Sequence, residues 1–232
     1  TTTPGYNTSA GRGYLTVKGS SDAGVVELAS GAADADNATM GLVQATDINS
    51  VAADKRSMAI VSRLSGTTAN NRGGNIEFWT KPDASTLVQR MQIDRNGNVT
   101  TPTQTAFEAK ICSTTINAGS TIVWETVLSN VGSAYNNTTG IFTAPVAGTY
   151  TFGFNTLMQF ADGGEYRVEF YKNGGLYNSI IQQKAANSWQ TIQGTISTFL
   201  NANDTIKINY SNGSGAVYLD CNYNRFWGRL SG

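Results

Sequence analysis

Apolar and polar residues alternate along several stretches in the second half of the chain. Three stretches place an apolar residue at every second position: Tyr150, Phe152 and Phe154; Tyr166, Val168 and Phe170; Ile206, Ile208 and Tyr210. The intervening residues, such as Arg167 and Glu169, are polar or small. A period of two with one apolar side is typical of a sheet that packs on one face and is wet on the other. A series of such strands predicts a β-sandwich.

The first part of the chain has short apolar runs between clusters of Gly, Asn, Asp and Ser. Six of these runs predict strands: residues 14–17, 25–28, 40–43, 58–64, 76–79 and 87–93. Residues 47–56 have a helical alternative, because Asp47 can cap a helix and Ile48 and Val51 fall on one face at helical spacing. Asn96 and Gly97 predict a two-residue hairpin turn, whose central positions both need positive φ.

A domain boundary is expected where the pattern lapses into Thr-Thr-Pro-Thr-Gln-Thr. Pro102 lacks a donor for a sheet ladder and forces its predecessor into an extended conformation. The predicted organisation is an N-terminal extension at 1–13, a β-rich domain at 14–100, a linker at 101–105 and a second β-domain at 106–232. The predicted fold class is all-β.

Charge makes nucleic acid an unexpected partner, and the length of the apolar runs does the same for membrane insertion. Lys plus Arg and Asp plus Glu number 16 each, so the formal net charge is zero, and only 14% of residues are charged. Nucleic acid is therefore not an expected partner, because a basic footprint is missing. Membrane insertion is not expected either, because no apolar run reaches the roughly 20 residues that span a bilayer.

The two cysteines leave two interpretations open. Cys112 and Cys221 are too few for a disulfide-dense scaffold. They can pair, or each can remain a buried thiol that behaves as a small core hydrophobe. The free-thiol interpretation is favoured, because nothing else in the chain indicates an oxidising compartment.

The chain has no histidine, which excludes Ser-His-Asp and Cys-His nucleophile systems and histidine-based metal sites. Two-carboxylate glycosidase chemistry needs only acids. The acids of the N-terminal half, such as Asp34, Asp47 and Asp83, fall mostly in turns, where carboxylates cap and solvate loops. The sequence therefore predicts a protein that is not an enzyme.

A string of spaced residues between 107 and 230 carries a family resemblance. It includes Phe107, Trp124, Leu128, Asn130, Tyr135, Gly140, Phe142, Pro145, Gly148, Tyr150, Phe152, Phe154, Lys172, Asn173, Gly174, Leu200, Asp204, Phe226, Gly228 and Leu230. This pattern resembles the globular head domain of the complement first-component subunit family, within the tumour necrosis factor-like superfamily. The resemblance implies a ten-stranded jelly roll at 106–232 that forms a tight homotrimer and binds ligands. Trp124 stands where the family often has Phe, and the family's variable loops carry no ligand identity over to this chain.

A second resemblance concerns the N-terminal half. Gly74 to Phe78, followed by Arg90 to Val99, resembles a segment found in bacteriophage tail-fibre and related virion proteins. It implies a fibre neck or shaft domain that contacts other virion proteins.

Aromatic residues with polar neighbours in the sequence and one acidic loop supply the candidate sites. Phe152, Phe154, Phe170 and Phe199 are expected in the core, whereas four aromatic residues lie beside Asn, Ser and Gly: Tyr177, Trp189, Tyr218 and Tyr223. These four either bind a sugar or protein ligand or fill the trimer interface or core. Asp162 and Glu165 flank a Gly pair, and some relatives carry calcium near the trimer apex, so this loop is either a Ca²⁺ site or an ordinary hairpin turn.

Both resemblances together predict a phage fibre protein whose trimeric head binds a host-cell surface glycan or protein receptor. The expected location is the virion, assembled in the host cytoplasm and facing the extracellular space. One alternative is a purely structural head or neck fibre or decoration protein. Another is a polysaccharide depolymerase.

Overall fold

The computed structural model describes residues 26–112, 116–160, 165–183, 188–213, 216–217 and 221–232. These residues form strands, turns and loops, and none of them lies in a helix. The all-β prediction is therefore confirmed. It follows that no described segment is a helix long and apolar enough to cross a membrane. The chain divides into two compact units, Thr1–Thr101 and Pro102–Gly232.

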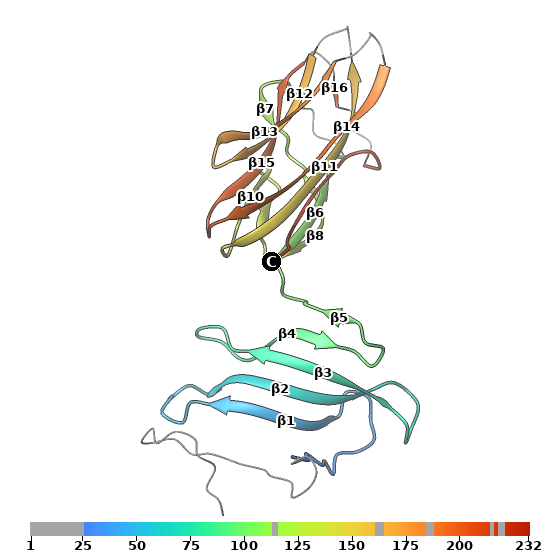
Figure 1. Cartoon of the computed structure of the whole chain (residues 1–232), viewed down its shortest axis with the longest axis vertical. Coiled ribbons are helices and arrows are strands. Elements are labelled where there is room, and N and C mark those ends of the chain that lie inside the picture. Colours follow the sequence, from blue (N-terminus) through green and yellow to red (C-terminus); the bar gives the residue numbers. More distant parts are fainter. Residues whose placement is uncertain (1–25, 113–115, 161–164, 184–187, 214–215, 218–220) are drawn as a thin grey trace, which may run out of the picture. The chain divides into compact units, whose positions relative to one another are not determined.

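The described part of the first unit is a five-stranded antiparallel meander, with neighbours in chain order (Figure 1). Its strands are β1 (Thr39–Thr46), β2 (Arg56–Ser65), β3 (Gly73–Thr80), β4 (Val88–Ile93) and β5 (Val99–Thr100). The predicted runs at 40–43, 58–64, 76–79 and 87–93 coincide with β1 to β4. The predicted strand at 14–17 and the predicted extension at 1–13 lie outside the described residues.

Two local predictions in this unit are wrong. Residues 26–28 form no strand, and the Leu28 side chain instead lies against the backbone at Gly41 of β1. Residues 47–56 form no helix. The Asp47 carboxylate accepts a hydrogen bond from the Asn49 N–H at 3.0 Å, while the Asp47 N–H bonds the Lys55 carbonyl at 2.9 Å. Asp47 therefore closes the loop between β1 and β2. A short polar side chain that could cap a helix can instead hydrogen-bond nearby backbone groups in a turn.

The turn between β4 and β5 also differs from the prediction. The Asp94 N–H bonds the Asn98 carbonyl at 3.0 Å and the Gly97 N–H bonds the Asp94 carbonyl at 2.9 Å, so the loop has three residues with Gly97 at φ +85°. The Asp94 carboxylate explains this choice, since it accepts the N–H groups of Asn96 and Asn98, each at 2.8 Å. Such a loop ends in a glycine bulge rather than in a two-residue turn.

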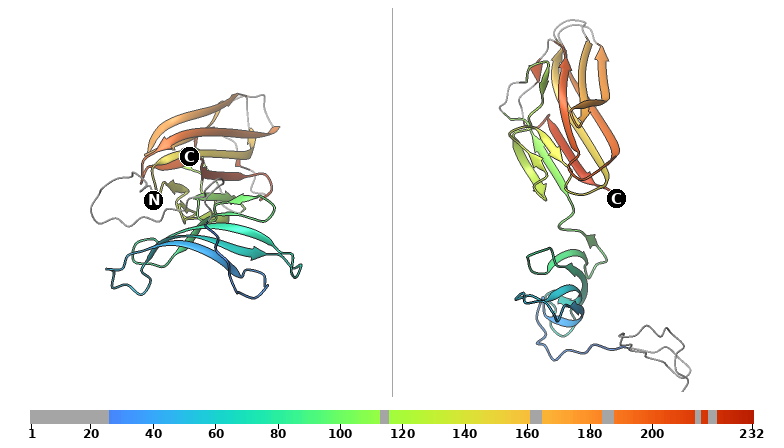
Figure 2. Two further views of the ribbon diagram at one scale, coloured as in Figure 1. Left: turned by 60° about the horizontal axis from the view of Figure 1, so that its bottom comes forward. Right: turned by 90° about the vertical axis from the view of Figure 1, so that its left-hand side faces the viewer.

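The second unit is a sandwich of two antiparallel sheets (Figure 2). Along the first sheet the order is β13 (Gly175–Gln183), β12 (Glu165–Lys172), β15 (Thr205–Asn212), β10 (Ile141–Thr143) and β9 (Tyr135–Asn136), with β7 (Ser120–Thr121) paired to β15. Along the second it is β14 (Ser188–Leu200), β11 (Gly148–Phe160), β17 (Arg225–Leu230), β6 (Ala106–Lys110) and β8 (Thr126–Val131), with β16 (Ala216–Val217) paired to β11. This two-sheet sandwich is the jelly roll that the sequence predicted for residues 106–232.

Aromatic side chains fill the space between the two sheets. The Phe107 ring stacks on Tyr135 with ring centroids 4.6 Å apart and meets the edge of Phe226 at 4.9 Å. Phe152, Phe154 and Phe170 are buried with them, as period-two patterning predicts. Asn173 and Gly174, at φ +51° and +79°, form the two-residue turn between β12 and β13.

Candidate binding and assembly surface

The sheet β14-β11-β17-β6-β8 has one face in the core and one face directed outward. Along β14, Ile192, Ile196 and Leu200 are buried, whereas the odd-numbered residues between them are exposed. The outward residues of β14 include Trp189 and Phe199. We call this outward surface the open face; it comprises Trp189, Gln193, Thr195, Ser197 and Phe199 of β14, Thr151 and Gly153 of β11, and Arg225, Trp227 and Arg229 of β17.

Phe199 corrects a prediction, because it is 56% exposed and does not belong to the core. Its neighbours Thr198 and Leu200 are buried, so the alternation of the strand turns Phe199 outward. A large aromatic ring that faces solvent on a sheet is typical of a contact surface rather than of a packed interior.

Trp227 forms the centre of the open face. It pairs with Gly153 of β11, and a Cβ on Gly153 would lie only 2.3 Å from the Trp227 ring. Glycine is therefore needed there so that the indole can lie flat on the sheet. Beside it, Arg225 Nε lies 3.3 Å from Glu108 Oε1, so a cation and an anion of this face neutralise each other.

Three of the four predicted ligand-binding aromatics lie in the described residues, and they do not gather at one place. Trp189 pairs with Gln159, while the backbone carbonyl of Tyr223 accepts a hydrogen bond from Asn155 Nδ2 at 2.7 Å. Trp189 therefore lies at the C-terminal end of β11, whereas Tyr223 contacts the middle of that strand. Tyr218 lies outside the described residues.

Tyr177 is at a different end of the sandwich. Its hydroxyl donates to Thr198 Oγ1 at 3.0 Å, and Thr198 is nine residues along β14 from Trp189. At about 3.3 Å per residue, that separation along the strand is roughly 30 Å. Tyr177 therefore cannot share one small-ligand pocket with Trp189 and Tyr223.

Of the predicted calcium ligands, Glu165 begins β12 and accepts a hydrogen bond from Arg167 Nε, whereas Asp162 lies outside the described residues. The salt bridge to Arg167 also raises the pKa of that guanidinium. Within the described ranges, no group of three or more His, Cys, Asp or Glu side chains is arranged to hold a metal ion. The calcium site remains a prediction.

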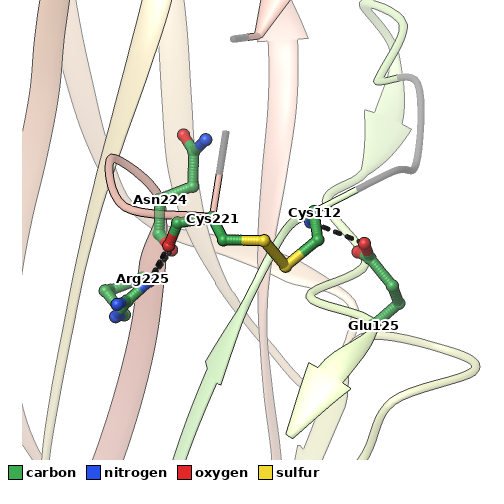
Figure 3. The surroundings of a disulfide bond; sticks show 5 residues. All are labelled: Cys112, Glu125, Cys221, Asn224 and Arg225. Carbon is green, nitrogen blue, oxygen red and sulfur yellow. Dashed lines mark hydrogen bonds between the residues drawn. A yellow bond between two sulfur atoms is a disulfide. The ribbon is translucent and has the colours of Figure 1, made fainter. Parts of the chain in front are cut away.

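The cysteines are paired, which corrects the favoured free-thiol interpretation. Cys112 follows β6, Cys221 precedes β17, and a disulfide bond joins them (Figure 3). The Cys112 N–H donates to Glu125 Oε1 at 2.6 Å, and the Cys221 carbonyl accepts a hydrogen bond from Arg225. β6 and β17 are antiparallel neighbours in the sheet, so the disulfide joins the two strands at one end of their ladder.

Sequence reasoning missed a buried carboxylate on the outward side of the other sheet. Glu169 of β12 is only 4% exposed. Ser179 Oγ donates to its carboxylate at 2.8 Å, and the hydroxyls of Ser211 and Tyr171 also donate to it. The period-two pattern placed Glu169 on the polar face, but Ser179 and Ser211 come from β13 and β15 and could be found only from the strand register.

Together, the sandwich and its strand order define a jelly-roll domain of the tumour necrosis factor-like fold class. The family model described as "C1q domain" matches residues 106–230, so the chain belongs to the C1q family. Domains of this family serve as ligand or structural domains rather than as enzymes, in agreement with the prediction that this chain is not an enzyme.

The chain is also similar to a curated mouse protein and to solved structures. The chain is 29% identical over 111 residues to mouse complement C1q tumor necrosis factor-related protein 3. The aligned region covers 48% of this chain and 45% of the relative. It thus spans about half the length of that curated relative. Similar solved structures are the globular domain of zebrafish complement 1qA (19% identity, 55% of this chain, 96% of that one, TM-score 0.46) and Eiger TNF from S. frugiperda (9% identity, 56% and 93%, TM-score 0.46).

These findings overturn the predicted phage fibre. The family and the mouse relative contradict a virion protein that binds a bacterial host, and the predicted virion location is wrong with it. The relatives and solved structures give no support to the resemblance of residues 74–99 to tail-fibre segments. That segment forms part of β3, β4 and the turn after them, which is an ordinary antiparallel arrangement with little power to discriminate between families.

Proposed function

We propose that this chain is a ligand protein whose C1q domain assembles as a homotrimer and binds a protein receptor. C1q and TNF-like domains as a class form homotrimers and bind receptors. The observation that carries the proposal for this chain is the open face, where Phe199 and Trp189 project outward and Trp227 lies flat over Gly153.

Burial of the exposed aromatic rings would stabilise the assembly. An exposed aromatic ring gains about 1.5–3 kcal/mol when it is fully buried. A closed three-fold assembly repeats that gain in each subunit. On the same face, Arg225 and Glu108 form a salt bridge, so these two charges offset each other. The open face is therefore suited to bury its aromatic residues against another copy.

Two matched substitutions test the assembly. Phe199→Lys should weaken association at least tenfold, because about 1.4 kcal/mol of lost contact energy corresponds to that factor. Leu176→Lys is the control, since Leu176 is 58% exposed and lies on β13 of the other sheet. Sedimentation velocity over a dilution series measures both. Equal dissociation of the two variants would contradict the assignment of the open face as the interface.

Receptor recognition is proposed for the aromatic residues that assembly leaves accessible. Tyr177 is the first candidate because it is half exposed on β13, with its hydroxyl oriented by Thr198. Trp189 belongs to the open face, which assembly would bury, so the second candidate is Tyr223, which is 49% exposed and accepts a hydrogen bond from Asn155 of β11. Large aromatic residues with polar neighbours are enriched in protein recognition.

Labelled wild-type protein should bind to the surface of cells that carry the receptor, and Tyr177→Ser or Tyr223→Ser should reduce this binding while the protein stays trimeric. Unchanged binding by both variants would remove these residues from the recognition surface. The Cys112–Cys221 disulfide is consistent with this role, because such bonds persist in oxidising, extracellular settings.

A further inference from the structure

The N-terminal sheet has one face made almost entirely of apolar residues. Residues that pair across neighbouring strands share a face. One row of paired residues runs Val43, Ile60, Phe78 and Met91, and the next runs Gly41, Ser62, Ile76, Ile93 and Val99. We call these two rows the apolar face. Every residue in both rows is uncharged.

The opposite face of the same sheet is closed by its own side chains. Arg63 Nε lies 2.8 Å from Glu77 Oε2, and the Trp79 indole N–H donates to the same oxygen at 3.0 Å. The Arg63 guanidinium also lies over the Trp79 ring, and these side chains leave Val61 and Glu77 buried. This side of the sheet therefore has a small core of its own.

The apolar face has no comparable cover among the described residues. Val43 is 58% exposed in the middle of β1, Ile76 and Val99 are also exposed, and Leu28 reaches only the border of the face at Gly41. A cavity of about 350 Å³ lies over this region and is lined by residues that include Leu28, Val43 and Ile60. A sheet normally buries its apolar face against a second layer, and a contiguous exposed patch of this kind marks an interaction surface.

We propose that the apolar face packs against the same face of other copies of this chain, so that the trimer is joined through both units. This inference rests on the proposed homotrimer. β5 ends at Thr100 and β6 begins at Ala106, so only residues 101–105 connect the sheet to the C1q domain. Five residues span at most roughly 18 Å. Assembly of three C1q domains therefore places three N-terminal sheets at a local concentration on the order of millimolar.

At that concentration even a weak affinity of the face for itself leads to contact. The absence of charge from both rows fits this occupant, because three identical faces with a net charge would repel one another. A partner of opposite charge would have no group in these rows to recognise.

The test introduces one thiol into the full chain, whose two native cysteines are paired. Val43→Cys places the thiol on the apolar face. Leu42→Cys, at the adjacent residue on the opposite face and 43% exposed, is the control. A short bismaleimide should cross-link Val43→Cys into covalent dimers and trimers, at a rate that does not depend on protein concentration and is at least ten times that of Leu42→Cys.

Three outcomes overturn the inference in a protein that sediments as a trimer. Rapid labelling of Val43→Cys by a monofunctional maleimide without cross-linking means that the face is uncovered. Protection from both reagents, together with an Ile76→Cys labelling rate that Val43→Lys does not raise, means that another segment of the same chain covers it. Cross-linking that rises with protein concentration means random collision between trimers. A protein that sediments as a monomer refutes the proposed homotrimer itself, which separates the two failures.

A second variant tests the packing without depending on cross-linker reach. In an Ile76→Cys background, Val43→Lys should raise the rate of maleimide labelling at least tenfold, because a lysine on the apolar face separates the copies. Leu42→Lys in the same background should leave that rate unchanged. Equal rates in the two double variants would count against face-to-face packing.

Discussion

Removal of the disulfide should cost the C1q domain a large part of its stability. Cys112 and Cys221 are separated by 109 residues, so the bond closes a long loop in the unfolded chain. The chain-entropy relation gives about 5 kcal/mol for a loop of that length at 25 °C, as an upper value because residual structure in the unfolded chain reduces it. A typical domain has a net stability of about 5–15 kcal/mol. The double variant Cys112→Ala/Cys221→Ala should therefore be folded only marginally.

Equilibrium unfolding in urea, followed by circular dichroism at one fixed protein concentration, measures the effect. We expect a loss of about 3–5 kcal/mol, and a melting temperature lower by roughly 2–4 °C for each kcal/mol lost. Both cysteines belong to the unit Pro102–Gly232, so a transition of the N-terminal sheet should not move. A loss below about 1 kcal/mol, or a wild-type protein whose stability is unchanged by reductant, would refute this reasoning.

Three further predictions concern single side chains. Arg63→Ala should destabilise the N-terminal sheet by on the order of 3 kcal/mol in urea unfolding, because it leaves the buried carboxylate of Glu77 without its cation. A smaller loss of stability in the double variant Arg63→Ala/Glu77→Ala would confirm that cause. Tyr135→Phe should cost about 1–3 kcal/mol, since the Tyr135 hydroxyl exchanges hydrogen bonds of 3.1 and 3.2 Å with the backbone of buried Trp124. Burial raises the pKa of Tyr135, so the stabilisation by its hydroxyl is fully present below about pH 10 and should decrease as pH rises above that value. Unfolding free energies of wild type and Tyr135→Phe across alkaline pH check this. Hydrogen bonds from Asn98 lower the pKa of Asp94, whose carboxylate closes the turn between β4 and β5. The amides of this hairpin should therefore stay protected from hydrogen exchange above about pH 4 and lose protection as pH falls through the lowered folded-state pKa of Asp94.

The alternation of residues predicted much of the fold because strand periodicity alone determines which face a side chain occupies. It placed Phe152, Phe154 and Phe170 in the core. Phe199 was misplaced because its residue type was weighed above its position. The same alternation, applied from Leu200 backwards along β14, would have turned it outward.

Asn-Gly pairs show the limit of local signals. Asn173 and Gly174 form the two-residue turn that the dipeptide favours, with positive φ at both positions. Asn96 and Gly97 do not, because the carboxylate of Asp94 captures two nearby N–H groups and extends the loop. The dipeptide predicts a turn in both places, but a neighbouring side chain decides its type.

Contacts between distant segments were beyond sequence reasoning. Pairing of the cysteines depends on β6 and β17 lying side by side, and burial of Glu169 depends on hydroxyls from two neighbouring strands. The family was identified correctly for residues 106–230 because many spaced positions agree at once. The phage interpretation failed because it rested on one short strand-turn-strand segment.

Sedimentation equilibrium of the wild-type chain in native buffer tests the central claim most directly. The subunit mass is 24.7 kDa, and the account predicts a single species at three times that mass at micromolar concentration. A melting temperature that rises with protein concentration should accompany it, because assembly stabilises the folded subunits. A stable monomer of 24.7 kDa at the same concentration would contradict the account.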